Sequence, residues 1–551
     1  MGSFIGICAS MLALAALYYA YAVIRYKRGQ YSVGNSMLPP IYPATVPILS
    51  NLLSYMIDSR DFFRRATISF MWFSIYAFQD RDSVRKIMSH PSLSSPMPMY
   101  LYCMKYLFGM PDSGLNAYKA DDSGPLSKPY AGSHVKPEHR IDFGLHQGYV
   151  KGLSGPGLTT TAQRIFQGVY QRFEAKEQSL SHEWANVPDI YGYFQTDLSS
   201  AVIQALFGSL ILEMHPDIVD DLWRYDDLLP WLAKGVPSWI YSEPYRSRDQ
   251  ICAKLKAWHA NARNNFDKSM IFSDGDGDPC WGSELTRERH QLLKYTHDDD
   301  ALASSDLGFM WAVIANTVPS ILYTVMHIFK DPNLLPRIRE EVSERFRGDI
   351  PAPEHVKDLK ALQNMPLLES AYAETLRLYV KTWVMVSSAH DDVDLGRWRL
   401  PRGCIGVINS DVSHMDKSFW NTQDGRHPVD EFWAERFLID PNDPSSGPIN
   451  PGMHSVGAAP EPGQNKDKPY FSRAGLMGSW MPYGGGPSIC PGRHLAKYVI
   501  FYVASLLVSK FDIELQDDRN TITLDAHRFG LGVGRPPGAI PIRVRKRKVV
   551  S

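Results

Sequence analysis

The stretch Trp480-Met-Pro-Tyr-Gly-Gly-Gly-Pro-Ser-Ile-Cys490-Pro-Gly-Arg-His-Leu-Ala496 gathers glycines and prolines around one cysteine, and an amphipathic helical pattern follows directly. This order predicts a rigid loop that delivers Cys490 at the start of a helix. A thiolate that binds iron needs backbone close to a flat macrocycle, amide N–H groups aimed at the sulfur and a positive helix N-terminus beside it. The glycines and the following helix can supply these features, and the thiolate would then donate electron density to the iron. The alternative is an inert, buried cysteine in a turn.

The same loop resembles the cysteine-ligand loop of the cytochrome P450 superfamily, which reads aromatic-x-x-Gly-x-x-x-Cys-x-Gly. Tyr483, Gly486, Cys490 and Gly492 stand at its four fixed positions. The resemblance implies that Cys490 is the axial ligand of the iron of haem b, and that Tyr483, Gly486 and Gly492 belong to the cofactor-binding loop. It also implies the fold of that superfamily, which is mainly α with small β-sheets.

Two further motifs of the superfamily occur ahead of the loop, in the expected order. Glu374 and Arg377 are three residues apart in a helical pattern, which places them on one face of the helix. Such a pair alone is usually a solvated surface pair. In the superfamily it is buried and is joined by an Arg from a later loop, and Ala434-Glu-Arg436-Phe437 resembles that loop. The resemblance therefore implies a structural ion-pair cluster of Glu374, Arg377 and Arg436, whose role is to specify the fold.

The run Trp311-Ala-Val-Ile-Ala-Asn316-Thr317-Val-Pro319 lies inside the helical pattern of residues 301–329. Most members of the superfamily carry an acid followed by an alcohol here, so the resemblance implies that Thr317 relays protons during oxygen activation and that Asn316 replaces the acid. Pro319 frees a carbonyl and can bend the helix, which opens a groove for oxygen. The run is similar to the branch with steroid 7α-hydroxylases, prostacyclin synthase and fungal secondary-metabolite enzymes, which contains isomerases as well as monooxygenases. The alternative is a kinked core helix with two solvated polar residues.

The sequence departs from the superfamily in two places. Ser488 stands two residues before the cysteine, where an Arg or His often pairs with a haem propionate, and His146 and Lys151 are the candidates that replace it in cofactor binding. The alternative for both is an ordinary exposed side chain. Residues 63–74 look too short for the first β-hairpin of the superfamily.

The N-terminus carries an uncharged apolar run over residues 4–24, which as a helix would be about 30 Å long and would match the hydrocarbon core of a bilayer. Tyrosines near its end fit an aromatic belt, and the basic residues that follow predict that the rest of the chain stays in the cytosol. These residues are Tyr18, Tyr19, Tyr21, Arg25, Lys27 and Arg28. The alternatives are a signal peptide, which the absence of a preceding Lys or Arg disfavours, and a buried helix.

The chain has 551 residues, of which 44% are hydrophobic, and this supports one large core with appendages. We expect a transmembrane anchor at 1–24, a basic and Pro-rich hinge at 25–50 and a catalytic domain at 51–551. Charges balance at 58 Lys and Arg against 59 Asp and Glu, so we expect no nucleic-acid partner. The six cysteines form no C-x-x-C pair, which argues against a zinc knot or a disulfide framework.

Helical patterning dominates, and strand-like segments are short. We predict helices at 197–214, 248–270, 301–329, 336–346, 365–379 and 493–510, and strands at 398–400, 404–408 and 540–544. Three stretches rich in Pro, Gly, Ser and Asp predict loop-like insertions at 109–137, 272–300 and 439–472.

Taken together, the sequence predicts a single-pass haem-thiolate monooxygenase of the endoplasmic reticulum, which inserts one atom of O₂ into a terpenoid, steroid-like or other lipophilic small molecule. Electrons would come from NADPH through NADPH-cytochrome P450 reductase, and we expect a monomer. Residues 309–314, 384–386 and 529–533 are predicted to line the pocket, or else to be ordinary core. Two alternatives stay open: a haem-thiolate isomerase or dehydratase that needs no reductase, and a membrane-tethered haem protein without activity.

Overall fold

A computed structural model describes residues 2–31, 37–39, 68–70, 73–91, 93, 97–130, 132–348, 350–388, 391–453, 468–516 and 524–548. The helices are α1 Gly2–Tyr31, α4 Arg81–Ser89, α5 Met97–Tyr102, α6 Asp112–Ala120, α7 Ile141–Leu153, α8 Gly157–Ser179, α9 Ile190–Phe207, α10 Leu210–Met214, α11 Ile218–Ala233, α12 Glu243–Asn265, α13 Glu284–Leu293, α14 Asp299–Ile314, α15 Thr317–Lys330, α16 Leu334–Phe346, α17 Pro366–Tyr379, α18 Ser410–His414 and α19 Arg493–Lys510. The strands are β1 Ile68–Phe70, β2 Phe73–Ala77, β3 Ala185–Val187, β4 Val380–Val386, β5 Val393–Asp394, β6 Arg399–Leu400, β7 Ile405–Asn409, β8 Leu438–Ile439, β9 Tyr470–Phe471, β10 Phe511–Leu515, β11 Leu531–Val533 and β12 Ile542–Lys546.

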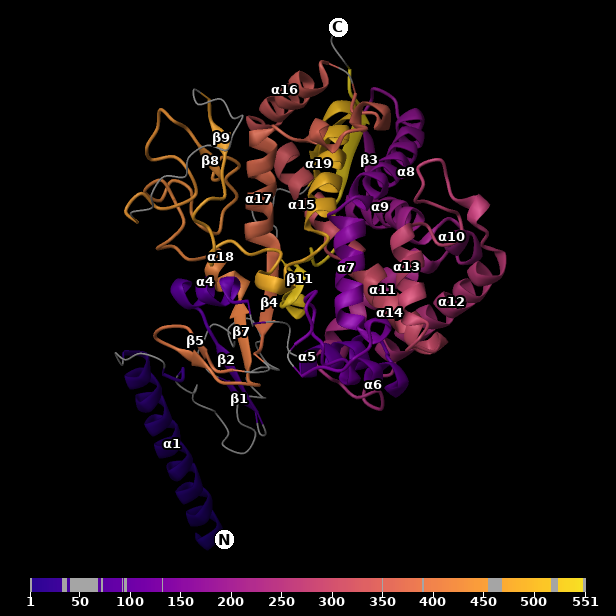
Figure 1. The fold of residues 1–551 in the computed structure, drawn as a ribbon. Coiled ribbons are helices and arrows are strands. Elements are labelled where there is room, and N and C mark those ends of the chain that lie inside the picture. Colours follow the sequence, from indigo (N-terminus) through magenta and orange to yellow (C-terminus); the bar gives the residue numbers. More distant parts are fainter. Residues whose placement is uncertain are drawn as a thin grey trace.

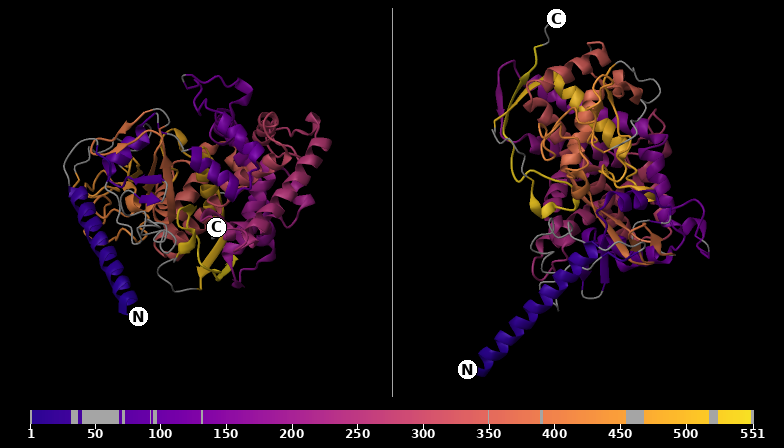
Figure 2. Two further views of the ribbon diagram at one scale, coloured as in Figure 1. Left: turned by 90° about the horizontal axis from the view of Figure 1, so that it is seen from below. Right: turned by 90° about the vertical axis from the view of Figure 1, so that its left-hand side faces the viewer.

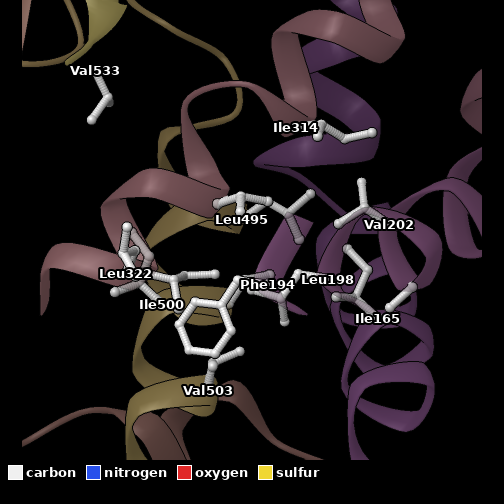
Figure 3. Packing of buried hydrophobic residues seen from close by; sticks show 14 of the residues in the cluster. Ile165, Phe194, Leu198, Val202, Ile314, Leu322, Leu495, Ile500, Val503 and Val533 are labelled. Carbon is white, nitrogen blue, oxygen red and sulfur yellow. The ribbon is translucent and has the colours of Figure 1, made fainter. Parts of the chain in front are cut away.

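The centre of the molecule is a bundle in which α19 packs against α15 and α8 (Figure 1). Helix α19 is buried at every residue from Val499 to Val508, as expected of a helix that is apolar all round. Figure 3 shows Ile500 and Val503 of α19 beside Leu322 of α15 and Phe194 of α9. The core therefore fixes the helix that begins directly after the cysteine loop.

The predicted helix at 301–329 is two helices, because α14 ends at Ile314 and α15 begins at Thr317. Pro319 stands in the first turn of α15 and has no N–H to donate to a carbonyl of the preceding turn, which explains the break. Over the described residues, the stretch Asp299–Lys330 is long and apolar enough to cross a bilayer, but 72% of its most apolar window is buried by the protein. It is therefore a core element, and the predicted bend is confirmed.

A five-stranded sheet lies at the side of the helical bundle, in the order β1-β2-β7-β4-β11 (Figure 1). Strand β4 follows α17 without a loop, and β11 pairs antiparallel with it, so that Val533 stands opposite Val380. The sheet therefore brings two of the predicted pocket segments, 384–386 and 529–533, onto neighbouring strands.

Two of the three predicted loop insertions contain helices. For these two stretches, the prediction of a loop was wrong. Helix α6 lies within 109–137, and α13 lies within 272–300. The sequence of α13 is mostly polar, but Leu285, Leu293 and even Arg289 face the core. A polar helix can be buried when its charges find partners, and composition alone does not show those partners. The described part of 439–472 has no helix.

The N-terminal segments differ from the sequence-based expectation in two details. Helix α1 continues to Tyr31 and so includes residues that we assigned to the hinge; it projects away from the body as a long arm (Figure 2). The first hairpin, which we expected to be too short, does form, because β1 and β2 pair antiparallel with Ile68 opposite Ile75. That expectation was wrong, since strands of only a few residues are enough to close the edge of the sheet.

A buried polar network ties α13 to α12 and α14. Asp306 accepts hydrogen bonds from Arg289 at 2.9 Å and lies 2.9 Å from Nε2 of His259 and 2.7 Å from Nε2 of His290. Burial alone would raise the pKa of Asp306, but the two imidazoles and the guanidinium outweigh it and hold that pKa well below the usual range. The charge of Asp306 is therefore the partner that Arg289 requires in the core.

We predict that Asp306→Asn destabilises the fold by about 3–5 kcal/mol, because it leaves the Arg289 guanidinium buried without an anion. Asp300→Asn on the same helix is the control, since Asp300 pairs with Lys256 at the surface and should have little effect. Urea denaturation followed by circular dichroism measures both. Equal midpoints for the two variants would contradict the prediction.

Candidate active site

Cys490 is the last residue but two before α19, at the end of a tightly folded loop. Its N–H donates to the carbonyl of Tyr483 at 3.0 Å, which closes the loop on itself. Gly484 and Gly486 have φ values of +71° and +64°, in the left-handed region that glycine tolerates best. The loop can therefore take this path only because glycine stands at these positions.

The surroundings of the Cys490 sulfur suit a metal-bound thiolate. Burial raises the pKa of the thiol, while the backbone N–H groups of Gly492 and Arg493 and the charge of Arg493 act in the opposite direction. A Cβ added at Gly492 would lie 3.8 Å from the Cys490 sulfur, so residue 492 packs directly against the side of that atom. A bound cation would supply the remaining charge that keeps the thiol deprotonated.

Helix α17 is linked to this loop by one direct hydrogen bond and by a second link that passes through His414 of α18. Arg377 donates to the carbonyl of His414 at 2.7 Å, and Nε2 of the same histidine accepts from the N–H of Met481 at 3.1 Å. Nε1 of Trp480 donates to the carbonyl of Ala373 at 3.1 Å. The start of the cysteine loop is thus fixed to the helix that carries Glu374 and Arg377.

The structure brings Glu374, Arg377 and Arg436 together in a cluster that is 0% exposed at every member. Arg377 donates to both carboxylate oxygens of Glu374 at 2.7 Å, and Arg436 donates to one of them at 2.9 Å. Burial alone would raise the pKa of Glu374, but the two guanidinium charges outweigh it and lower that pKa. Arg436 also donates to backbone carbonyls of Pro428 and Glu431, so the cluster folds the segment that precedes it.

One face at the junction of α14 and α15 is partly open, although residues 301–307 and 318–326 on either side of it are buried. The more exposed residues follow helical spacing and include both predicted proton-handling residues: Gly308, Trp311, Ala312, Val313, Asn316 and Thr317. The Thr317 hydroxyl has no hydrogen-bond partner among the residues that the structure describes. It is therefore available to a ligand or to water.

Asn316 is held by the C-terminal strand. Its Oδ1 accepts from the N–H of Val533 at 2.9 Å, and a Cβ at Gly532, where φ is +117°, would lie 2.1 Å from that same oxygen. Only glycine fits at residue 532, and β11 then locks the Asn316 amide in place. Segment 529–533 therefore lies against the open face of the helix pair.

His146 and Lys151 both lie on α7, but the structure does not bring them to one point. Lys151 forms ion pairs with Glu284 at 3.1 Å and with Glu288 at 2.6 Å on α13. His146 is partly buried, one turn beyond Asp142. The cofactor-binding role of these two residues remains a prediction.

A buried ionic cluster next to segments 309–314 and 529–533 was not predicted from the sequence. Asp226 of α11 is 1% exposed and accepts from Nη2 of Arg528 at 2.9 Å and from the indole N–H of Trp311, and it also pairs with Arg535. Trp311 belongs to the predicted pocket segment 309–314, and Arg528 directly precedes segment 529–533. Nothing in the spacing of these residues indicates the contacts, because Asp226 is 85 residues from Trp311 and 302 residues from Arg528.

A large open groove of about 1590 Å³ occurs elsewhere, lined by Arg81, His327, Asp416, Phe432 and Asp525 among others. It contains neither Cys490 nor Thr317, and of the predicted pocket segments it touches only Phe529. Its charged, open wall does not suit a lipophilic substrate. We therefore place the candidate site at the cysteine loop and not at this groove.

Comparison with known proteins identifies the family. The cytochrome P450 family model matches residues 210–542. The chain is 29% identical to the cytochrome P450 monooxygenase efuG of Hormonema carpetanum over 532 residues, which cover 93% of this chain and 90% of that protein. It is 30% identical to the cytochrome P450 monooxygenase fsoE of Humicola fuscoatra over 536 residues, 94% and 89% of the two chains. It is 23% identical to the 25-hydroxycholesterol 7-alpha-hydroxylase of Rattus norvegicus over 419 residues, 73% and 89%.

The chain belongs to the cytochrome P450 family, and the predicted enzyme class, a P450 monooxygenase, is confirmed. The mainly α fold with small sheets is confirmed as well. Fungal monooxygenases and a sterol 7α-hydroxylase are among its relatives, as the Asn-Thr-x-Pro run indicated. The family uses haem iron, O₂ and electrons from a redox partner.

The residues present fit a haem. The Cys490 thiol, with two backbone N–H groups directed at it, is the donor that a haem-thiolate centre requires. Gly492 packs against the sulfur without a side chain of its own, and the more open face of α14 and α15 carries Thr317 and Ala312.

We predict that Glu374→Gln destabilises the protein by about 3–5 kcal/mol and abolishes stable haem loading, because two buried guanidinium groups lose the anion that both of them bind. Glu369→Gln on the same helix is the matched control, since Glu369 pairs with Lys497, whose side chain is 26% exposed. Chemical denaturation and the haem-to-protein absorbance ratio measure the two effects. Normal haem content in the Glu374 variant would contradict this role.

Proposed function

We propose that this protein is a haem-thiolate monooxygenase that inserts one oxygen atom from O₂ into a lipophilic small molecule, with Cys490 as the axial ligand of the iron. The observation that carries the proposal is the Cys490 loop, whose sulfur receives N–H groups at the start of a buried helix. Haem bound there supplies oxygen activation, and the thiolate favours cleavage of the O–O bond.

The residues of this chain have separate tasks in the proposal. Tyr483, Gly486 and Gly492 shape the loop, and Glu374, Arg377 and Arg436 hold it against α17 through His414. Thr317 offers a free hydroxyl on the open helix face and delivers protons at that place. The Asn316 amide, fixed by Val533, orients the backbone beside it. His146 and Lys151 remain the proposed partners of the haem propionates.

A terpenoid, steroid-like or other bulky lipophilic scaffold is the proposed substrate class. Residues 309–314, 384–386 and 529–533 supply apolar walls, and the relatives include a hydroxylase named for 25-hydroxycholesterol. The Asp226 cluster joins two of these walls, so the pocket they form should be stiff.

We further propose that α1 anchors the protein in the endoplasmic reticulum membrane with the catalytic domain in the cytosol, where NADPH-cytochrome P450 reductase delivers the electrons. Leu17, Tyr21 and Ile24 of α1 are each more than half exposed, so the protein does not cover these three apolar side chains. Helix α1 extends away from the body (Figures 1 and 2), as an anchor requires.

We predict that the reduced wild-type protein gives the thiolate-type carbon-monoxide spectrum and that Cys490→Ser abolishes it, because a serine hydroxyl is not a thiolate donor. Cys280→Ser is the control, since Cys280 is a buried cysteine in a different segment, between α12 and α13. Absence of the spectrum in the wild type would defeat both the monooxygenase and the isomerase, and would favour a protein without activity.

We predict that Thr317→Val separates NADPH consumption from product formation, since it removes the only hydroxyl of that residue and keeps its shape. With reductase and 25-hydroxycholesterol as the first probe, more hydrogen peroxide and at least about tenfold less hydroxylated product should form per NADPH. Thr324→Val is the control, because its hydroxyl only binds the carbonyl of Ser320 at 2.8 Å. Unchanged coupling in the Thr317 variant would contradict the assigned role.

The source of the oxygen atom and the need for a reductase separate the two enzyme proposals. A monooxygenase must incorporate oxygen from isotope-labelled O₂ and must require both NADPH and reductase. Product formation from a peroxide substrate without either would identify an isomerase or dehydratase in its place.

A further inference from the structure

Three buried side chains that can bind a metal ion converge where α12, α13 and α14 meet (Figure 1). His259 of α12, His290 of α13 and Asp306 of α14 are 0%, 8% and 1% exposed. Nε2 of His259 and Nε2 of His290 lie 2.9 Å and 2.7 Å from the same oxygen, Oδ2 of Asp306. One ligand atom from each residue lies within 4.8 Å of the other two, so the three donor atoms face one point in the core.

The two oxygens of the Asp306 carboxylate have different partners. Arg289 donates to Oδ1 at 2.9 Å, so the guanidinium uses the oxygen that the imidazoles do not face. Arg289 is itself held by Tyr149, to whose hydroxyl it donates, and by the ring of Phe309, whose centroid lies 4.6 Å from Cζ. A carboxylate that binds a metal is commonly held through hydrogen bonds of this kind. Arg289 therefore fixes Asp306 and leaves Oδ2 available.

Hydrogen bonding within the cluster leaves His259 incomplete. Its Nδ1 is buried and has no hydrogen-bond partner among the residues that the structure describes. No neighbour at Nδ1 therefore decides which ring nitrogen carries the proton. With the proton on Nε2, the ring donates to Asp306; with the proton on Nδ1, the Nε2 lone pair faces the carboxylate and requires a cation between them.

Aromatic rings enclose the three ligands. The ring of His290 lies 4.4 Å from that of Trp281, and the ring of His259 lies 4.9 Å from that of Trp258, measured between centroids. An apolar shell of this kind limits the access of water to a metal site and strengthens the attraction between the ion and its ligands. The surroundings therefore suit an ion that stays bound.

We propose that His259, His290 and Asp306 form a structural zinc site that ties α12, α13 and α14 together. Two imidazole nitrogens and one carboxylate oxygen are a donor set that zinc accepts, with water in the fourth position. Tetrahedral zinc with bonds of about 2.0–2.1 Å separates its ligand atoms by about 3.3 Å, so the two imidazoles need to move outward by only about half an ångström. Three neutral histidines also hold zinc in proteins, so the ligand charges need not cancel that of the ion, even beside Arg289.

The experiment measures zinc in the haem-loaded full chain. The protein is treated with a chelator, incubated with zinc chloride and dialysed, and elemental analysis then counts zinc separately from iron. The wild type should retain about one zinc per chain, and His290→Gln should retain clearly less, since glutamine can still donate to Asp306 but does not replace an imidazole ligand. Added zinc should raise the thermal midpoint of the wild type and not that of the variant, because the ion binds only the folded chain.

His182→Gln is the matched control. His182 is exposed, and its Nδ1 lies 3.1 Å from the carbonyl oxygen of Lys546, far along the chain from the proposed ligands. This variant should retain zinc like the wild type. If His290→Gln does not fold, His259→Gln tests the same ligand set. The zinc X-ray absorption spectrum of the wild type reads the two imidazole ligands without any substitution.

Zinc retained equally by the wild type and by both ligand variants would identify an adventitious ion only and would overturn this inference. A wild-type protein that retains no zinc, or a spectrum without imidazole ligands, would overturn it as well and would leave a hydrogen-bonded network around Asp306. None of these measurements depends on whether Cys490 binds haem, so the proposed function stands or falls separately.

Discussion

The rest of the structure depends on the ion pairs of one carboxylate, that of Glu374, with two buried guanidinium groups. A charge cluster with no exposed member has lost all contact with water, and one Glu against two Arg leaves it with an excess positive charge. Desolvation on this scale is expensive, so the cluster persists only where further hydrogen bonds satisfy its donors. Backbone carbonyls of Pro428, Glu431 and His414 provide them. The cluster can therefore form only when chain segments distant in sequence have taken one particular path.

The same arrangement of chain segments also positions the cysteine loop. The carbonyl of His414 accepts from Arg377, and its imidazole accepts from Met481 at the beginning of the loop, so one histidine connects the ion pairs to the site. Burial lowers the pKa of His414 to about 3, which keeps Nε2 free to accept at neutral pH. The position of the cysteine thus depends on electrostatics some way from the sulfur, and a change in the cluster should reach the site without any direct contact.

Helix bounds and the cysteine loop could be predicted from the sequence, because each depends on a pattern of neighbouring residues. The helix at 493–510 has the predicted bounds, and the helix at 366–379 begins one residue from its predicted start, because each follows a Pro or Gly signal and carries a regular apolar pattern. The loop itself was identified from fixed offsets of glycine and cysteine. Pro319 in the first turn of α15 likewise predicted the break between α14 and α15.

Contacts whose partners come from distant segments could not be predicted in this way. The composition of α13 reads as a loop, because Arg289 and His290 look like surface residues until Asp306 and His259 are placed beside them. The same holds for Asp226 with Arg528 and for Tyr372 with Tyr483. In each case a polar side chain is buried because it contacts a second polar side chain. A single sequence does not show which residues come into contact.

The replacement of an acid by Asn316 becomes understandable from its contacts. An amide cannot release a proton at neutral pH, and its oxygen is already occupied by the N–H of Val533. Asn316 therefore serves as a brace between the broken helix and β11, and Gly532 is the residue that makes this close approach possible. Under the proposed function, proton delivery then falls to the free hydroxyl of Thr317 and to water on the open helix face. Asn316 thus holds the backbone at the break, and its neighbour Thr317 moves the proton. This division of roles explains how the chain can keep the alcohol without the acid.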